Sequence, residues 1–365
     1  MDKSSVKDRN HTVDVLKCIA CFMVVLLHYP TREFGSEFVN IQTMLGRCGV
    51  PIFFMISGMF AGKRFTAKKE TKASNKWFLN QAVKMMGYFV LFSIIMFLFY
   101  QIYDLILCSS KPTINPANWF SETNILKFLL ANQPFFGGIY WYLLAFAYCL
   151  LIYWIASKFK YGLTIIAWLT PVLMVGYYVL GRYSNVIIDG GVPFYYSSNF
   201  LFAAIPMFTI GFYLPKMNFK KLTASNTVIL IAVSVVLLYC ESMALKSVPK
   251  MDSGRNNYVF NLVIAFFILY FVSHNPQVNV KGSNILAVIG MKYSLYIYAF
   301  QGLANSIWTA LIKSSKGRSI GVYFSTVYNI GKPLVVFLTA LAMSIVFCLI
   351  VELFKLVYHK TVKKT

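Results

Sequence analysis

The chain has 365 residues, of which 58% are hydrophobic and 17% aromatic, whereas only 13% are charged. Because soluble domains carry roughly a quarter charged residues, this composition and a mean hydropathy of +0.63 exclude an ordinary soluble protein and indicate one that spans a bilayer. The net charge of +22 does not indicate nucleic-acid binding, because Lys and Arg lie in short clusters between apolar segments, as determinants of membrane topology do.

Apolar segments recur along the whole chain, and a membrane-spanning helix needs about 20 apolar residues. The sequence predicts ten spanning helices, over residues 13–31, 47–62, 78–103, 138–156, 162–181, 199–215, 225–243, 257–273, 294–312 and 331–353. We expect the first segment to be retained, because it shows no small-residue cleavage pattern of a signal peptide. The result is one all-α integral membrane domain over 1–365, with short tails at 1–12 and 354–365, in the cell membrane.

The first segment, VDVLKCIACFMVVLLHYP, carries three ionisable side chains, Asp14, Lys17 and His28. On a helix, Lys17 and His28 lie within about 20° of each other around the axis and about 16 Å apart along it. Asp14 precedes Lys17 by three residues, so the two can pair on the same face. Ionisable groups on a spanning helix usually face a bundle interior or a wet cavity, which favours a polar path that ends at a histidine able to exchange a proton.

Simpler interpretations of these residues remain open. Asp14 and Lys17 can form a self-neutralised pair that reaches the membrane surface at a helix end, and His28 can contact lipid headgroups. The segment ILKFLLANQPFFGG, which follows the third predicted span, is too short to cross a bilayer and is typical of an interfacial or re-entrant helix.

Two motifs in the first 60 residues resemble those of the acyltransferase type 3 family of polytopic membrane O-acyltransferases. The first, RNHTVDVLKCIACFMVVLLH, has an Arg-Asn pair, an Asp, a basic residue and, after ten residues, a histidine. The second is RCGVPIFFMISGMF, and weaker similarities follow at IYWYLLAF, NFLFAAIPMFTIGFYL and YSLYIYAFQ. They occur in the family's order and cover most of the chain.

The resemblance implies a membrane-bound transferase that moves an acyl group, most often acetyl, from cytosolic acyl-CoA to a hydroxyl of a glycan or lipid-linked sugar. His28 would be the catalytic base or acyl carrier, with Lys17 and Asp14 beside the donor path. The co-substrate is acyl-CoA, with no permanently bound cofactor and no metal, and the other partners are membrane lipids. The residues expected to bind donor or acceptor are Asn10, Arg47, Ser57, Gly58, Arg64, Lys84, Trp141, Tyr142 and Gln301.

Three positions depart from the family's pattern. Lys17 stands where an Arg is usual, Lys84 alone remains of a basic cluster, and Gln301 replaces a late histidine and cannot shuttle a proton. The last two favour an alternative, a transporter-like protein that moves a small substrate or glycan without acyl transfer. A scaffold for polysaccharide assembly is a third possibility. Ser57 and Gly58 also suit close helix packing, and Arg64, with its neighbouring lysines, also suits a topology signal.

We predict that both termini face the cytoplasm, because the loops on their side of the ten helices carry most of the 34 Lys and Arg residues. Cysteines placed at position 365 and in the 63–76 loop should be labelled only after the membrane is permeabilised. Labelling of either position from outside intact cells would contradict this topology.

Overall fold

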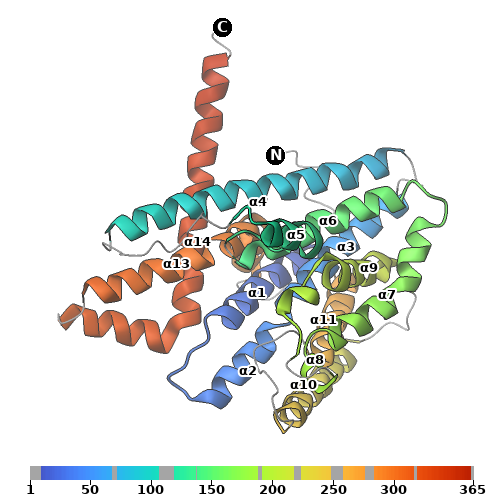
Figure 1. Cartoon of the computed structure of the whole chain (residues 1–365), viewed down its shortest axis with the longest axis horizontal. Helices are drawn as coiled ribbons and strands as arrows, with labels where there is room; N and C mark the ends of the chain where they lie inside the picture. Colours follow the sequence, from blue (N-terminus) through green and yellow to red (C-terminus); the bar gives the residue numbers. More distant parts are fainter. Residues whose placement is uncertain are drawn as a thin grey trace. The chain divides into compact units, whose positions relative to one another are not determined.

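The computed structural model of the protein describes residues 10–67, 72–106, 119–136, 138–187, 191–217, 223–247, 258–275, 283–315 and 319–362. Every regular element within these ranges is a helix (Figure 1). The chain forms two compact units: a terminal unit, Met1–Gly46 with Gln277–Thr365, and a central unit, Arg47–Pro276. The prediction of one domain over 1–365 stays a prediction.

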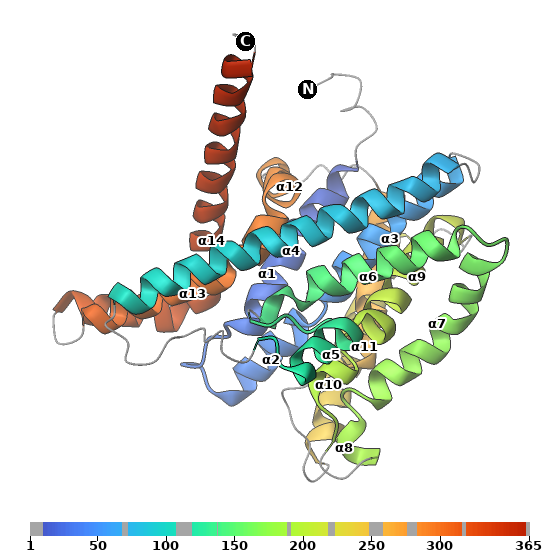
Figure 2. The same cartoon turned by 45° about the horizontal axis from the view of Figure 1, so that its top comes forward.

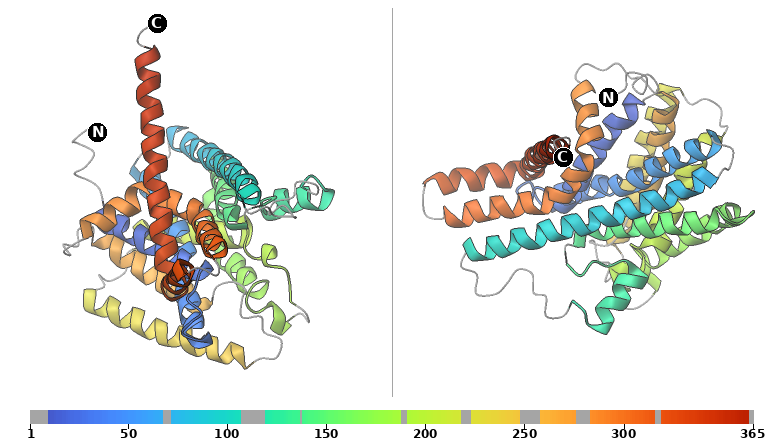
Figure 3. Two further views of the ribbon diagram at one scale, coloured as in Figure 1. Left: turned by 90° about the vertical axis from the view of Figure 1, so that its left-hand side faces the viewer. Right: turned by 90° about the horizontal axis from the view of Figure 1, so that it is seen from above.

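The terminal unit is built from both ends of the chain. Its helices are α1 (His11–His28), α2 (Ser36–Gly46), α12 (Ser283–Lys292), α13 (Ser294–Ser314) and α14 (Ser319–Val362). α1 packs on α12 and α2, while α13 and α14 pack along each other, as Figure 3 shows in orange and red. α14 bends sharply at Gly331, which has non-helical φ and ψ of −105° and 20°, two residues before Pro333.

The central unit contains α3 (Gly49–Ala67), α4 (Lys72–Ile106), α5 (Glu122–Ala131), α6 (Trp141–Ala156), α7 (Gly162–Val179), α8 (Ser184–Ile187), α9 (Ile205–Tyr213), α10 (Ala224–Lys246) and α11 (Val259–His274). Short turns of 3-10 helix lie at η3 (Gly138–Tyr140), η4 (Phe194–Tyr196) and η6 (Leu214–Lys216), and a π-helix, η5 (Phe200–Ala204), leads into α9. The closest pairs are α3 with α9, α4 with α6 and α10 with α11; Figure 2 shows α4 and α6 side by side.

Glycines bring α3 and α9 into backbone contact. A Cβ on Gly58 would collide with the Phe208 carbonyl oxygen, and one on Gly211 would collide with the Met55 carbonyl oxygen. Small residues at such a crossing allow the close van der Waals packing that holds helices together in lipid. Beside this crossing, the Tyr153 hydroxyl makes a buried hydrogen bond of 2.7 Å with Thr209.

The structure has helices at all ten predicted places. Among the described residues, seven helical segments are long and apolar enough to cross a membrane. They are His11–His28, Ser36–Phe65, Asn75–Ile106, Gly138–Ala156, Gly162–Val179, Ala224–Lys246 and Gly321–Tyr358. The segments Phe200–Lys216 and Val259–His274 are shorter, and α13 is more polar. The count of ten spans and the cytoplasmic termini therefore stay predictions.

The sequence did not predict α2 and α12, two helices of 11 and 10 residues. Both are too short and too polar to be recognised by a search for spans of about 20 apolar residues. The predicted short helix after the third span is present as α5, which Ser121 caps by accepting from the Asn124 N–H at 3.4 Å.

Replacement of Gly211 by Ala should destabilise the protein, because the new methyl group meets backbone that has no alternative rotamer. We expect a lower midpoint of thermal unfolding, equivalent to about 1–3 kcal/mol of overpacking. The matched control is Gly87→Ala in α4, where nothing lies within 4 Å of the added Cβ and a better helix former replaces Gly. Reaction of the buried cysteines with a thiol-sensitive dye on heating reports both midpoints; equal midpoints would contradict the close α3–α9 crossing.

Candidate functional site

An ion pair and a helix cap define the first turns of α1. Asn10 is the N-cap, since its side-chain oxygen accepts from the Val13 N–H at 3.0 Å. One turn on, Lys17 Nζ lies 3.1 Å from Asp14 Oδ1, with side-chain exposures of 22% and 6%. The i, i+3 pairing expected from the sequence is therefore present, and it reduces the cost of placing two charges in an apolar helix.

Two further helices of the terminal unit hold this polar end of α1. Gly290 of α12 faces the Asp14 carbonyl so closely that a Cβ there would collide with it. The Cys21 thiol donates to the Ser294 carbonyl at 3.2 Å, and His11 Nε2 lies 3.0 Å from Asn284 Oδ1. The backbone that carries Asp14 and Lys17 is thus fixed from outside α1.

His28 is the last residue of α1 and is exposed. The chain beyond it is anchored: the Tyr29 N–H donates to the Val25 carbonyl at 2.8 Å, and the Thr31 N–H donates to Gln42 Oε1 of α2 at 2.8 Å. The 11 residues between Lys17 and His28 correspond to about 16 Å of helix rise. The structure therefore places these two predicted site residues at opposite ends of one helix and not in contact.

Gln301 lies in the middle of α13 and is fully buried. Its Nε2 donates to the Tyr298 carbonyl at 3.1 Å, whereas its Oε1 has no hydrogen-bond partner among the described residues. An unsatisfied buried acceptor is costly, so this amide oxygen is available to a donor that the described residues do not supply.

Arg47, Ser57 and Gly58 belong to the central unit. Arg47 is 8% exposed just before α3. The Ser57 hydroxyl donates to the Phe53 carbonyl of its own helix at 2.9 Å, and Gly58 forms the contact with α9 described above. The structure thus gives Ser57 and Gly58 roles within and between helices.

Trp141 and Tyr142 begin α6. The Trp141 carbonyl accepts from Asn132 Nδ2 at 3.3 Å, and its ring meets Phe194 edge-on with 6.0 Å between centroids. The Tyr142 ring lies 4.5 Å from that of Phe54 in α3. Both aromatic rings therefore join α6 to other parts of the central unit.

Arg64 and Lys84 are exposed, and each lies over an aromatic ring of α4. The Arg64 guanidinium is 5.8 Å from the centroid of Trp77, and Lys84 Nζ is 5.7 Å from that of Tyr88. Lys68 and Lys69 of the predicted basic cluster lie outside the described residues. Exposed cations on aromatic faces remain open to an anionic ligand, since such contacts contribute only about 0.5–1 kcal/mol.

Sequence reasoning missed a polar cluster at the ends of α7, α10 and α11. Tyr183 donates to Glu241 Oε1 at 2.6 Å, and the same carboxylate accepts from the first backbone N–H groups of α11, at 2.9 Å and 3.3 Å. Arg182 is 4% exposed, with its guanidinium 4.0 Å from the Tyr258 ring centroid. Burial, the hydrogen bond to Glu241 and its negative charge raise the pKa of Tyr183, while Arg182 opposes the shift.

The signal for this cluster was present in the sequence. Arg182 immediately follows one predicted apolar span, and Glu241 is an acid inside another. Charges at such places are usually paired or functional. No group of three or more His, Cys, Asp or Glu side chains suited to a metal ion occurs in the described part of the chain.

Comparison with known proteins gives one finding. A family model described as an acyltransferase domain, that of acyltransferase type 3, matches residues 10–353. No curated protein and no solved structure matches the chain. The match begins at the N-cap of α1 and continues into the last turns of α14. The protein is a membrane acyltransferase of the type 3 family.

Proposed function

We propose that the protein transfers an acyl group, in the first place acetyl, from cytosolic acyl-CoA to a hydroxyl of a glycan or lipid-linked sugar at the outer face of the cell membrane. One observation carries the proposal: in a chain of this family, α1 holds a fixed Asp14–Lys17 pair at one end and an exposed His28 at the other.

The chemistry at His28 needs one proton transfer and one displacement. An imidazole nitrogen of His28 takes the proton of the acceptor hydroxyl, whose oxygen attacks the thioester carbonyl of the donor. The new C–O bond forms as the C–S bond breaks, and the coenzyme A thiolate leaves and takes up a proton. In a two-step version, His28 accepts the acyl group first and then passes it to the hydroxyl.

Lys17 and Asp14 act as positioning residues in this scheme. They lie about 16 Å from His28 along α1, too far to touch the reacting atoms. The pair has no net charge, so it lines a donor path with hydrogen-bonding groups without placing an isolated charge in the membrane. Asn10 fixes the start of the same helix, and Arg47, Arg64, Lys84 and Gln301 are the further groups proposed to meet donor or acceptor.

Transport without acyl transfer is the second candidate. The observation that favours it is Gln301, which is fully buried, has an amide oxygen without a partner among the described residues, and stands where the family usually has a histidine. A buried amide can bind a polar substrate but cannot exchange a proton with it.

His28→Ala tests acyl transfer directly. We expect loss of O-acylation by about 100- to 10,000-fold, the usual effect of removing a general base, with thermal stability near that of the wild type because the side chain is exposed. The control is His274→Ala, at a histidine the scheme does not use. Near-normal O-acylation by His28→Ala, in cells lacking other acyltransferases, would move transport to first place.

Substitutions at Lys17 test the positioning role. Lys17→Arg keeps the charge opposite Asp14 and should retain activity, whereas Lys17→Leu leaves the buried carboxylate of Asp14 unpaired and should lower it. The double variant Lys17→Leu/Asp14→Asn removes both charges, so it separates a loss of activity from a loss of stability. If it recovers stability but not activity, the pair serves the reaction; if it recovers both, the pair is structural.

Neutralising Lys63, Arg64 and Lys84 to Gln should raise the apparent Michaelis constant for the donor by about tenfold and make it less sensitive to salt. The control replaces Lys246 and Lys313, which lie at the ends of α10 and α13 that are predicted to face outward. An unchanged constant, with normal insertion, would leave the three cations as determinants of topology.

A further inference from the structure

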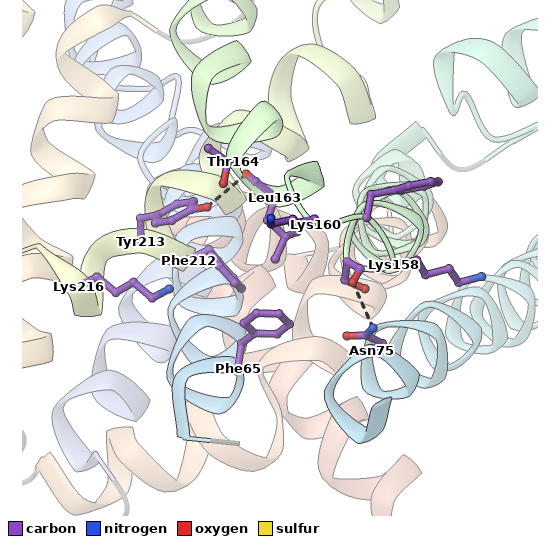
Figure 4. Close-up of a pocket in the computed structure, with 11 residues that line it drawn as sticks. Phe65, Asn75, Lys158, Lys160, Leu163, Thr164, Phe212, Tyr213 and Lys216 are labelled. Carbon is purple, nitrogen blue, oxygen red and sulfur yellow. Dashed lines mark hydrogen bonds between the residues drawn. The ribbon is translucent and has the colours of Figure 1, made fainter. Parts of the chain in front are cut away.

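The central unit contains a cavity of about 330 Å³ that none of the residues discussed so far lines (Figure 4). It lies where helices end: Phe65 comes from the last turn of α3, Asn75 from the start of α4, and Phe212 from the end of α9. The loop between α6 and α7 closes another side. A cavity of this volume lies at the lower end of the range that small-molecule sites occupy.

The lining of this cavity is cationic. It includes Lys158, Lys160 and Lys216 and no acidic residue. Figure 4 shows Lys160 and Lys216 on two sides of the cavity, whereas the Lys158 side chain extends away from it; its ammonium lies 3.6 Å from the Trp154 ring centroid. Two ammonium groups around one space, with no carboxylate in its wall, favour an anion between them.

The frame of the cavity is held by hydrogen bonds that do not involve these lysines. Asn75 Nδ2 donates to the Ser157 carbonyl at 3.2 Å, which ties α4 to the end of α6. The Tyr213 hydroxyl donates to the Leu163 carbonyl at 3.2 Å, which ties α9 to α7. Both bonds are drawn in Figure 4. The walls are therefore tied together by hydrogen bonds in which no lysine ammonium group takes part.

The inner surface combines these cations with aromatic rings. Phe65 and Phe212 lie 5.8 Å apart between centroids, and Lys216 Nζ is 5.9 Å from the Phe212 centroid. Lysine is a common phosphate ligand that acts as a compact point charge, and a phenyl ring offers apolar contact to an organic group. The two features together suit an anion attached to an apolar or planar group.

We propose that this cavity binds a phosphate-bearing ligand, with its phosphate between Lys160 and Lys216 and its organic part against Phe65 and Phe212. The proposal does not depend on acyl transfer. Two sources carry this chemistry: the headgroup of an anionic phospholipid, and the phosphates of a soluble nucleotide. The topology prediction places the loop that carries Lys158 and Lys160 in the cytoplasm, where both sources occur.

The test uses the purified full chain in detergent. The soluble probe is adenosine 3′,5′-bisphosphate, followed by titration calorimetry. The lipid probe is phosphatidylglycerol against phosphatidylcholine in mixed micelles, followed by lipid retention in native mass spectrometry. We expect one probe to bind to the wild type and Lys160→Gln/Lys216→Gln to weaken it by about tenfold or more. Lys158→Gln is the matched control, because that ammonium points elsewhere, and it should bind within about twofold of the wild type.

A charge-retaining variant, Lys160→Arg/Lys216→Arg, guards against a folding defect and should keep the binding. Selective binding of the bisphosphate assigns the cavity to a soluble nucleotide, and selective retention of phosphatidylglycerol assigns it to a lipid. Absence of binding by either probe, or equal binding by the Gln double variant and the wild type, would overturn the proposal.

Discussion

The charge pair of α1 is the constraint on which the terminal unit depends. Asp14 and Lys17 place two charges in an otherwise apolar helix, and their 3.1 Å contact lets each neutralise the other. The pair keeps its place because Gly290 lets α12 approach the Asp14 carbonyl with no intervening side chain. A glycine 276 positions away in the sequence thus fixes the backbone from which the charged side chains project, and α1 extends from there to His28.

Close backbone contacts at glycines also determine the packing of the central unit. Gly58 and Gly211 allow α3 and α9 to approach each other closely, and the aromatic rings of Phe54 and Tyr142 pack α3 against α6. Residues that the family resemblance assigns to substrate binding therefore also build the scaffold. Substitutions at Gly58 need a stability measurement beside any activity measurement, because loss of packing and loss of binding lower activity alike.

Two polar regions depend on side chains that come from distant parts of the chain. Glu241 of α10 caps α11 and accepts from Tyr183, which follows α7. Lys160 and Lys216 line one cavity, although 56 positions separate them in the sequence. Neither arrangement follows from local periodicity. Both arise where helices end, since chain reversals there bring the polar residues of separate loops together.

The sequence alone determined the helical membrane class, the places of the main helices, the acyltransferase family and the Asp14–Lys17 pair. Each rests on composition or on spacing within one helix, where 3.6 residues per turn fixes the geometry. Only the tertiary structure decided that Gly58 packs on α9, that Gln301 is buried with an amide oxygen that lacks a partner among the described residues, and where α2 and α12 pack on α1. These depend on contacts between separate helices, which a pattern along one helix does not encode.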